Sequence, residues 1–247
     1  MRLRLPGKVE GWRRFAGEIA IIVIGVLIAL YAQQVVEDRN DRARVDSAIA
    51  ALRTEVAWID FYASESEMTS PCVLAQIEAI QKRLASGEGG LLPRYSDTSS
   101  KGFVLRMPGR TWSDSVWQSV SASDTLRRLR PTIDLHLSAM STQANDQAER
   151  VKLSEGWVND LGVLSVMVPT GEAERMRLIG VTEHLRGIVQ SIDLSAGQMR
   201  DSIAAAGLLA SKSWLDKQLS ESGTVKFCRA HRLPLGNLRP AIAANAY

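Results

Sequence analysis

The 14 residues from Ile19 to Ala32, IAIIVIGVLIALYA, carry no charge and decide how the rest of the chain is organised. Nine of these 14 residues are Ile, Val or Leu, and each of these favours insertion into a bilayer by about 0.3 to 0.6 kcal/mol. A helix needs about 20 residues to cross the hydrocarbon core, and extending the segment to residues 15–36 gives it 22. The polar side chains that the extension adds lie near its ends, within reach of the headgroups. We therefore predict a transmembrane helix over residues 15–36.

Two other interpretations fit an apolar segment in this position: the buried core helix of a soluble domain, and a signal peptide that is cleaved after export. Five basic residues precede the segment, which is typical of a membrane or export signal rather than a core helix. Cleavage after Ala32 would place Leu30 at the −3 position, where signal peptidases prefer a small residue. The sequence therefore favours an anchor that is retained.

The excess of positive charge lies before the apolar segment. The chain has 30 Lys and Arg against 27 Asp and Glu; the first 18 residues hold five basic and two acidic residues, which leaves 25 of each in the remainder. Basic residues stay on the cytoplasmic side. This predicts an inner-membrane protein with a cytoplasmic basic arm over residues 1–14 and a periplasmic part from residue 37 to the C-terminus. A neutral body argues against a nucleic-acid partner.

Small residues at Gly25 and Ala29 mark a candidate packing face on the transmembrane helix. Two small residues four positions apart allow a second helix to approach closely. We therefore expect the lipid bilayer as one partner and a homodimer, formed through the transmembrane and juxtamembrane helix, as a second. The pattern is also common in membrane helices that do not dimerise, so that alternative stays open.

The same segment carries a resemblance to a known family. Glu18-Ile19, Ile22-Val23 and the run from Gly25 to Leu30 fit the pattern E-I-x-x-I-V-x-G-[VI]-L-I-A-L. This resembles the start of a bacterial family of small single-pass membrane proteins of unknown function. The match covers about 20 residues, and the chain departs from the pattern at residues 33–38, where many members carry an Asn-Trp-Asn-like segment. The resemblance implies an anchor, and it implies no catalytic residue.

The exported part shows the periodicity of an amphipathic helix. Apolar residues follow one another at intervals of four and three, which is the spacing of one helix face: Val45, Ile49, Leu52, Val56, Ile59 and Ala63. We expect the transmembrane helix to continue outward to about Glu67. The stripe fits either a coiled coil between two copies or the core-facing side of a bundle, and we favour the bundle.

Further helices are expected along residues 71–206. Ser70 and Pro71 resemble an N-cap and first helical position, which predicts a new helix ending near Gly87. A glycine- and proline-rich loop over residues 87–110 follows, and then a short helix from a capping box at Thr111 and Asp114. Two long helices, over residues 126–167 and 171–206, are joined by a short turn and predict an antiparallel hairpin.

These elements predict an all-α protein, in which the transmembrane helix continues into an exported antiparallel helical bundle over residues 37–222. Residues 223–247 contain four basic residues, no acidic residue and two prolines, and predict a basic, irregular C-terminal tail. We expect this tail to be solvated; a tail that faces lipid is the alternative. Its basic residues are Lys226, Arg229, Arg232 and Arg239.

Cys72 and Cys228 are the only cysteines. A lone pair in an oxidising compartment usually bridges, so we predict a disulfide that ties the tail to the helix at residue 72. Two separate buried thiols are the alternative.

The sequence contains no motif that assigns a reaction. It lacks H-E-x-x-H, C-x-x-C, a G-x-S-x-G elbow and a phosphate-binding glycine loop, and its histidines are isolated: His136, His184 and His231. We expect no cofactor and no metal site. The leading hypothesis is a non-enzymatic interaction or scaffold module that binds an unknown membrane or periplasmic protein. The alternatives are a ligand-sensing bundle with a pocket near Trp112 and Trp117, and a membrane-anchored hydrolase.

Overall fold

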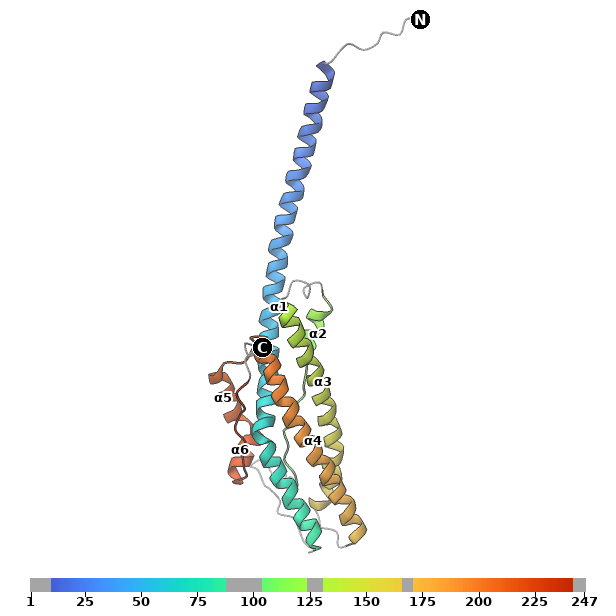
Figure 1. Cartoon of the computed structure of the whole chain (residues 1–247), viewed down its shortest axis with the longest axis vertical. Helices are drawn as coiled ribbons and strands as arrows, with labels where there is room; N and C mark the ends of the chain where they lie inside the picture. The colour runs from blue at the N-terminus through green and yellow to red at the C-terminus, as the bar shows by residue number, and fades with distance from the viewer. Residues whose placement is uncertain (1–9, 88–103, 124–130, 166–170, 242–247) are drawn as a thin grey trace, which may run out of the picture. The chain divides into compact units, whose positions relative to one another are not determined.

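The computed structural model describes residues 10–87, 104–123, 131–165 and 171–241. These residues form helices and connecting segments without a strand, so the all-α prediction is confirmed for them (Figure 1). The chain divides into two compact units, Met1–Ala48 and Ile49–Tyr247. The elements in chain order are α1 (Glu10–Ser86), α2 (Ser115–Ser121), α3 (Pro131–Asp160), the 3-10 helix η2 (Leu161–Ser165), α4 (Glu172–Ala205), α5 (Lys212–Glu221) and α6 (Gly223–Ala230).

The described part of the first unit is the N-terminal half of α1. Its large apolar side chains, from Ile19 to Tyr31, are exposed. An 18-residue stretch of this helix has a mean hydropathy of 2.4, and none of it is buried. By length and composition it is the one candidate for a membrane span in the described chain. Residues 1–9 of the predicted basic arm lie outside the described residues, and residues 10–14 form the start of α1.

The helix does not end before Pro71, and the predicted boundary at Ser70 and Pro71 is wrong. α1 continues through Pro71 to Ser86. A proline inside a helix cannot donate to the carbonyl four residues earlier, here that of Glu67. The C-terminal segment approaches α1 at this place: the Gly236 N–H donates to the Met68 carbonyl at 2.8 Å. Backbone from the tail thus takes part in the hydrogen bonding next to the proline.

The core of the second unit lies between α1, η2 and α4. Leu52, Val56, Ile59 and Ala63 of the predicted stripe are buried within this single chain, as the bundle interpretation requires. Further along α1, the main core cluster joins side chains from α1, the segment at residue 105, η2 and α4: Val73, Ile77, Ile80, Leu84, Leu105, Leu161, Leu164, Leu178, Val181, Leu185 and Val189.

The long helices are antiparallel only in part. α4 runs opposite to α1, because Gln81 bonds to Thr182 while Arg200 bonds to Asp60. α3 packs against α4 as the predicted hairpin, so α1 and α3 run in the same direction (Figure 1). The expectation of a wholly antiparallel bundle is therefore wrong at this pair. Residues 104–123, which we call the returning segment, run back along α1: Arg106, Arg110 and Val116 bond in turn to Gln76, Glu65 and Glu55.

The C-terminal region holds more regular structure than the sequence predicted. α5 was not predicted, and α6 occupies the start of the tail that was expected to be irregular from residue 223. Both helices pack on α1 through apolar side chains: Leu215 and Leu219 of α5 meet Phe61, and Phe227 of α6 packs against the disulfide. Residues 232–241 have no regular structure, as predicted.

Candidate functional site

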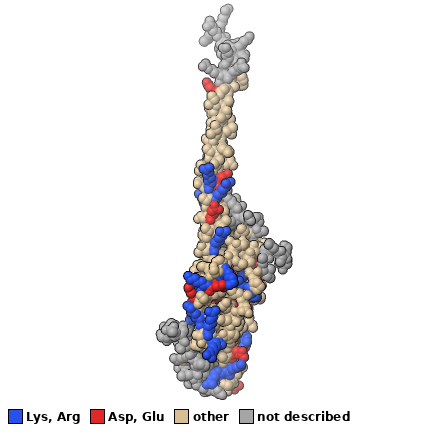
Figure 2. Space-filling view, turned by 90° about the vertical axis from the view of Figure 1, so that its left-hand side faces the viewer, with Lys and Arg blue, Asp and Glu red and all other residues tan. Residues whose placement is uncertain are grey.

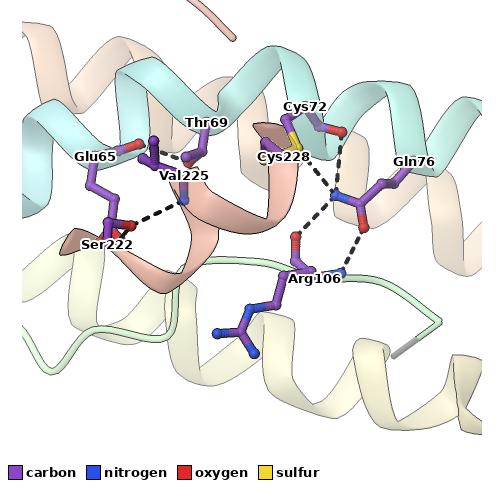
Figure 3. Close-up of a disulfide and its surroundings, with 8 residues drawn as sticks. All are labelled: Glu65, Thr69, Cys72, Gln76, Arg106, Ser222, Val225 and Cys228. Atoms are coloured by element: carbon purple, nitrogen blue, oxygen red, sulfur yellow. Dashed lines mark hydrogen bonds between the residues drawn. A yellow bond between two sulfur atoms is a disulfide. The ribbon is translucent and has the colours of Figure 1, made fainter. Parts of the chain in front are cut away.

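The predicted disulfide is confirmed. The sulfurs of Cys72 on α1 and Cys228 on α6 lie 2.03 Å apart, and both residues are fully buried (Figure 3). Phe227, Leu233 and Leu235 pack around the bridge. The bond therefore fixes α6 and the start of the following segment against the middle of α1.

Three carboxylates are buried on α1 in the turns that precede Cys72. Asp60, Glu65 and Glu67 are 1%, 0% and 4% exposed. A buried carboxylate is strongly unfavourable unless cations and hydrogen-bond donors surround it. Arginines from three separate parts of the chain supply the charge: Arg110, Arg200 and Arg239. We call these six residues the carboxylate–arginine network.

Glu65 is bound from two sides. Arg110 donates to it through Nε at 2.6 Å and Nη2 at 2.8 Å, a two-point contact. The same bond raises the pKa of the Arg110 guanidinium above its usual value. Ser222 donates its hydroxyl to Glu65 and accepts from the Val225 N–H at 3.1 Å (Figure 3). Ser222 is the N-cap of α6, so one hydroxyl joins the start of α6 to α1.

Asp60 and Glu67 share one arginine. Arg200 on α4 donates to Asp60 at 3.1 Å and to Glu67 at 3.0 Å, and its Nη1 also donates to the Arg239 carbonyl at 2.8 Å. Arg239 donates in turn to Glu67 at 2.9 Å. The Ala210 N–H supplies a further donor to Asp60 at 3.1 Å. The network thus joins α1, α4 and the C-terminal segment with three negative and three positive charges.

Asp193 lies at the edge of this network. The Arg239 guanidinium donates to the Asp193 backbone carbonyl at 2.7 Å, and its distance to the carboxylate is 3.9 Å. Partial burial raises the pKa of the Asp193 carboxyl above its usual value, and the charge of Arg239 opposes this shift. The charged form of Asp193 is therefore less favourable in the folded state than in water.

Polar side chains of α1 also hold the returning segment. Gln76 donates to the Arg106 carbonyl at 3.2 Å and accepts from the Arg106 N–H at 2.8 Å (Figure 3). Glu55 accepts from the Val116 and Trp117 N–H groups at 2.9 and 3.0 Å. Glu55 therefore accepts hydrogen bonds from two backbone N–H groups at the N-terminus of α2.

The prediction that Thr111 and Asp114 form a capping box is wrong. Asp114 occupies the N-cap position of α2, but its side chain makes no cap hydrogen bond. It binds the side chains of Gln118, Ser141 and Asn145 instead.

Two cavities adjoin the returning segment. The smaller, about 30 Å³, lies between α1, Arg110, Trp112 and α4, and has room for about one or two waters. The larger, about 370 Å³, lies between residues 105–109 and α3 and falls in the size range of small-molecule pockets. From α3 it is lined by Val151, Ser154, Glu155, Val158 and Asn159.

The other predicted site residues are not brought together. A Cβ on Gly25 would meet nothing within 4 Å, and Ala29 is exposed, so the predicted packing face is open in the single chain. His184 stacks on Trp157 with ring centroids 4.8 Å apart, and His231 lies beside Phe227 at 4.6 Å. In the described part of the chain, no group of three His, Cys, Asp or Glu side chains could hold a metal ion.

Sequence reasoning missed the carboxylate–arginine network. One signal was available, because Asp60 and Glu67 are seven residues apart and so lie on one face of a helix. Their partners could not be found this way, since Arg200 and Arg239 are 133 and 172 residues from Glu67. Comparison with family models, curated proteins and solved structures found no match.

Proposed function

We propose that this chain is a single-pass protein of the bacterial inner membrane whose helical second unit lies in the periplasm and acts as a non-enzymatic interaction module. The observation that carries the proposal is the N-terminal half of α1. A continuous helix displays Ile, Leu and Val side chains on every side, and its most apolar stretch is wholly unburied. Water is a poor solvent for such a surface, whereas a bilayer is a good one.

The second unit supports an extracytoplasmic location. Its one disulfide joins residues that are 156 positions apart, and such bonds persist in oxidising compartments. The resemblance of residues 18–30 to the start of the bacterial membrane-protein family supports the same location. The experiment is flotation of native membranes after alkaline washing, combined with the mass of the chain without reduction. We expect the intact chain in the lipid layer with its two thiols oxidised; recovery in the wash would contradict the anchor.

The network and the disulfide support a module that keeps one shape. They hold α1, α4, α6 and the tail to one another through buried charges and a covalent bond. Such a body suits a role in which a fixed surface is presented to partners. Crosslinking in native membranes tests this role: we expect a defined partner or a dimer through Gly25 and Ala29, and a monomer without partners would contradict it.

Binding of a small molecule is the second candidate. It is favoured by the cavity of about 370 Å³ between residues 105–109 and α3, which presents both apolar and polar side chains. A ligand that binds the folded state raises the unfolding temperature. We expect such a shift with at least one compound in a metabolite screen, and its loss in Val158→Trp, which fills the cavity. A shift that survives this substitution would place the ligand elsewhere.

A further inference from the structure

α6 presents a purely basic face to solvent. Its exposed residues are Gly223, Lys226, Arg229 and Ala230, while its opposite side is buried against α1. Lys226 and Arg229 are three positions apart and are neighbours on the helix surface. The exposed Arg232 follows at the end of the helix. We call Lys226, Arg229 and Arg232 the α6 basic face.

These cations differ from several other exposed cations of the second unit. Lys212, Lys82 and Arg177 each have an acidic partner within 2.9 Å. In the described part of the chain, Lys226, Arg229 and Arg232 have none. The Arg106 guanidinium adds a further positive charge beside Gly223, 3.3 Å from where a Cβ would lie. Figure 2, which faces α5 and α6, shows more Lys and Arg than Asp and Glu over this part of the surface.

Arg232 stands where glycine is the favoured residue. Its φ is 55°, in the left-handed region, and it is the one described residue other than glycine with a positive φ. The other two such positions are Gly87 and Gly207. Arg232 ends α6 in the usual way, with the Leu233 N–H bound to the Cys228 carbonyl at 2.9 Å. An arginine here adds backbone strain that glycine would avoid.

The surroundings of the face indicate the kind of partner. Protein interfaces are centred on aromatic or aliphatic anchors. Among the described residues from 212 to 241, no large apolar side chain is exposed. Separate cations on a rigid support, held by the disulfide and by Ser222, match a plane of phosphate groups instead.

We infer that the α6 basic face docks on the headgroups of an anionic phospholipid bilayer. The inference rests on the proposed function in one respect: it requires the second unit to lie in the periplasm, a compartment bounded by lipid bilayers. Each cation strengthens such binding about fivefold. The contact is electrostatic, so it weakens as salt is added.

The test uses the full chain in phosphatidylcholine nanodiscs fixed to a sensor, with vesicles passed over them. We expect binding of vesicles that contain about one third phosphatidylglycerol and no binding of neutral vesicles. Lys226→Ala, Arg229→Ala and Arg232→Gly together should weaken binding roughly 100-fold. A chain that enters the discs but ignores anionic vesicles would overturn this inference and leave the anchor standing; a chain that cannot enter the discs would overturn both.

Single variants separate a docking role from a structural one. Arg232→Gly should lower vesicle binding about fivefold while the urea midpoint stays equal or rises, because glycine relieves the strain. Lys212→Ala is the matched control, since its ammonium is already bound by Asp216, and it should leave binding unchanged. Equal loss in both variants, or a lower midpoint with unchanged binding in Arg232→Gly, would contradict the inference.

Two competitors identify the source of the phosphate. Inorganic phosphate at constant ionic strength should not release the vesicles, because it offers one group where a bilayer offers many. A DNA duplex with the same phosphate concentration should bind more weakly than the vesicles. Release by inorganic phosphate, or tighter binding of the duplex, would replace the proposed bilayer with a different ligand.

Discussion

The two halves of α1 follow opposite rules of burial. In the N-terminal half, apolar side chains such as Leu27 are 59% exposed, whereas Asp60, Glu65 and Glu67 further along the same helix are almost inaccessible. In a soluble protein each pattern is unfavourable by itself. The first becomes favourable in lipid. The second becomes favourable when guanidinium groups and N–H donors replace the lost water.

This difference shows that the surroundings of a helix decide which of its side chains are favourably buried and which are favourably exposed. From Ile19 to Tyr31 the large apolar side chains of α1 are exposed, so the proposed bilayer must supply their apolar solvent. In the second unit, α4, α5, α6 and the tail supply both apolar contacts and arginines. Substitutions at the two halves should therefore have opposite dependence on side-chain polarity.

The largest expected effect comes from removing the shared cation of the network. Arg200→Met leaves Asp60 and Glu67 buried without their common partner, and breaking a buried pair in this way costs about 3–5 kcal/mol. Urea unfolding of the full chain in neutral micelles measures the loss. Arg177→Met removes an exposed pair with Glu174, which solvent screens, and should change the stability far less. Similar losses for the two variants would show that burial does not distinguish them.

A charge in the apolar half of α1 should be nearly as costly for insertion. Leu27→Arg places a guanidinium near the centre of the proposed span, at an apparent cost of about 3–4 kcal/mol. The chain should then move from the membrane to the soluble fraction. Leu153→Arg is the matched control, because Leu153 on α3 is 57% exposed and should face water. If Leu153→Arg also moved the chain to the soluble fraction, the result would contradict the assignment of Leu27 to lipid and Leu153 to water.

The disulfide should contribute somewhat less than the network. Cys72→Ala with Cys228→Ala is expected to lower the free energy of unfolding by about 2–4 kcal/mol. The urea midpoint of the wild-type chain should fall on reduction, while that of the double variant should not respond to reductant. A wild-type urea midpoint that is the same with and without reductant would show that the disulfide does not stabilise the fold.

The smallest effect concerns pH at the edge of the network. Burial raises the pKa of Asp193, so the folded state holds this proton to a higher pH than the unfolded state. Ionisation of Asp193 therefore costs stability as the pH rises above its ordinary value of 3.8. Asp193→Asn should exceed the wild type in stability at pH 7, by less than about 0.5 kcal/mol for a partly exposed group.

The gain should vanish when the pH falls below the ordinary pKa of Asp193, where both states of the wild type are protonated. Asp146→Asn on the exposed surface of α3 serves as the control for the loss of one carboxylate. A gain that grows as the pH falls would have the wrong sign and would contradict the burial of Asp193.

Local patterns predicted the parts of the fold that depend on neighbouring residues. The apolar stripe from Leu52 to Ala63, the hairpin of α3 and α4 and the pairing of two lone cysteines were all available from spacing, number and compartment. The passage of α1 through Pro71 was not available, because Gly236, which bonds next to it, is 168 residues from Met68 by their numbers.

The network was hidden for the same reason. Glu67 could be recognised as an acid on the core side of a helix, but nothing near it in sequence supplies a cation. The parallel direction of α1 and α3 likewise depends on Gln76 and Glu55, which hold the returning segment along α1. Long-range polar contacts decided these features, and a single sequence does not display them.

The central claim is that residues 15–36 stay in the bilayer and deliver the second unit to the far side. A protein that fluoresces only when it folds in the cytosol, fused after Tyr247, tests this most directly in living cells. The account predicts dark cells with the intact fusion in the membrane fraction, and bright cells when the fusion carries Leu27→Arg. Bright cells with the unaltered chain would contradict it.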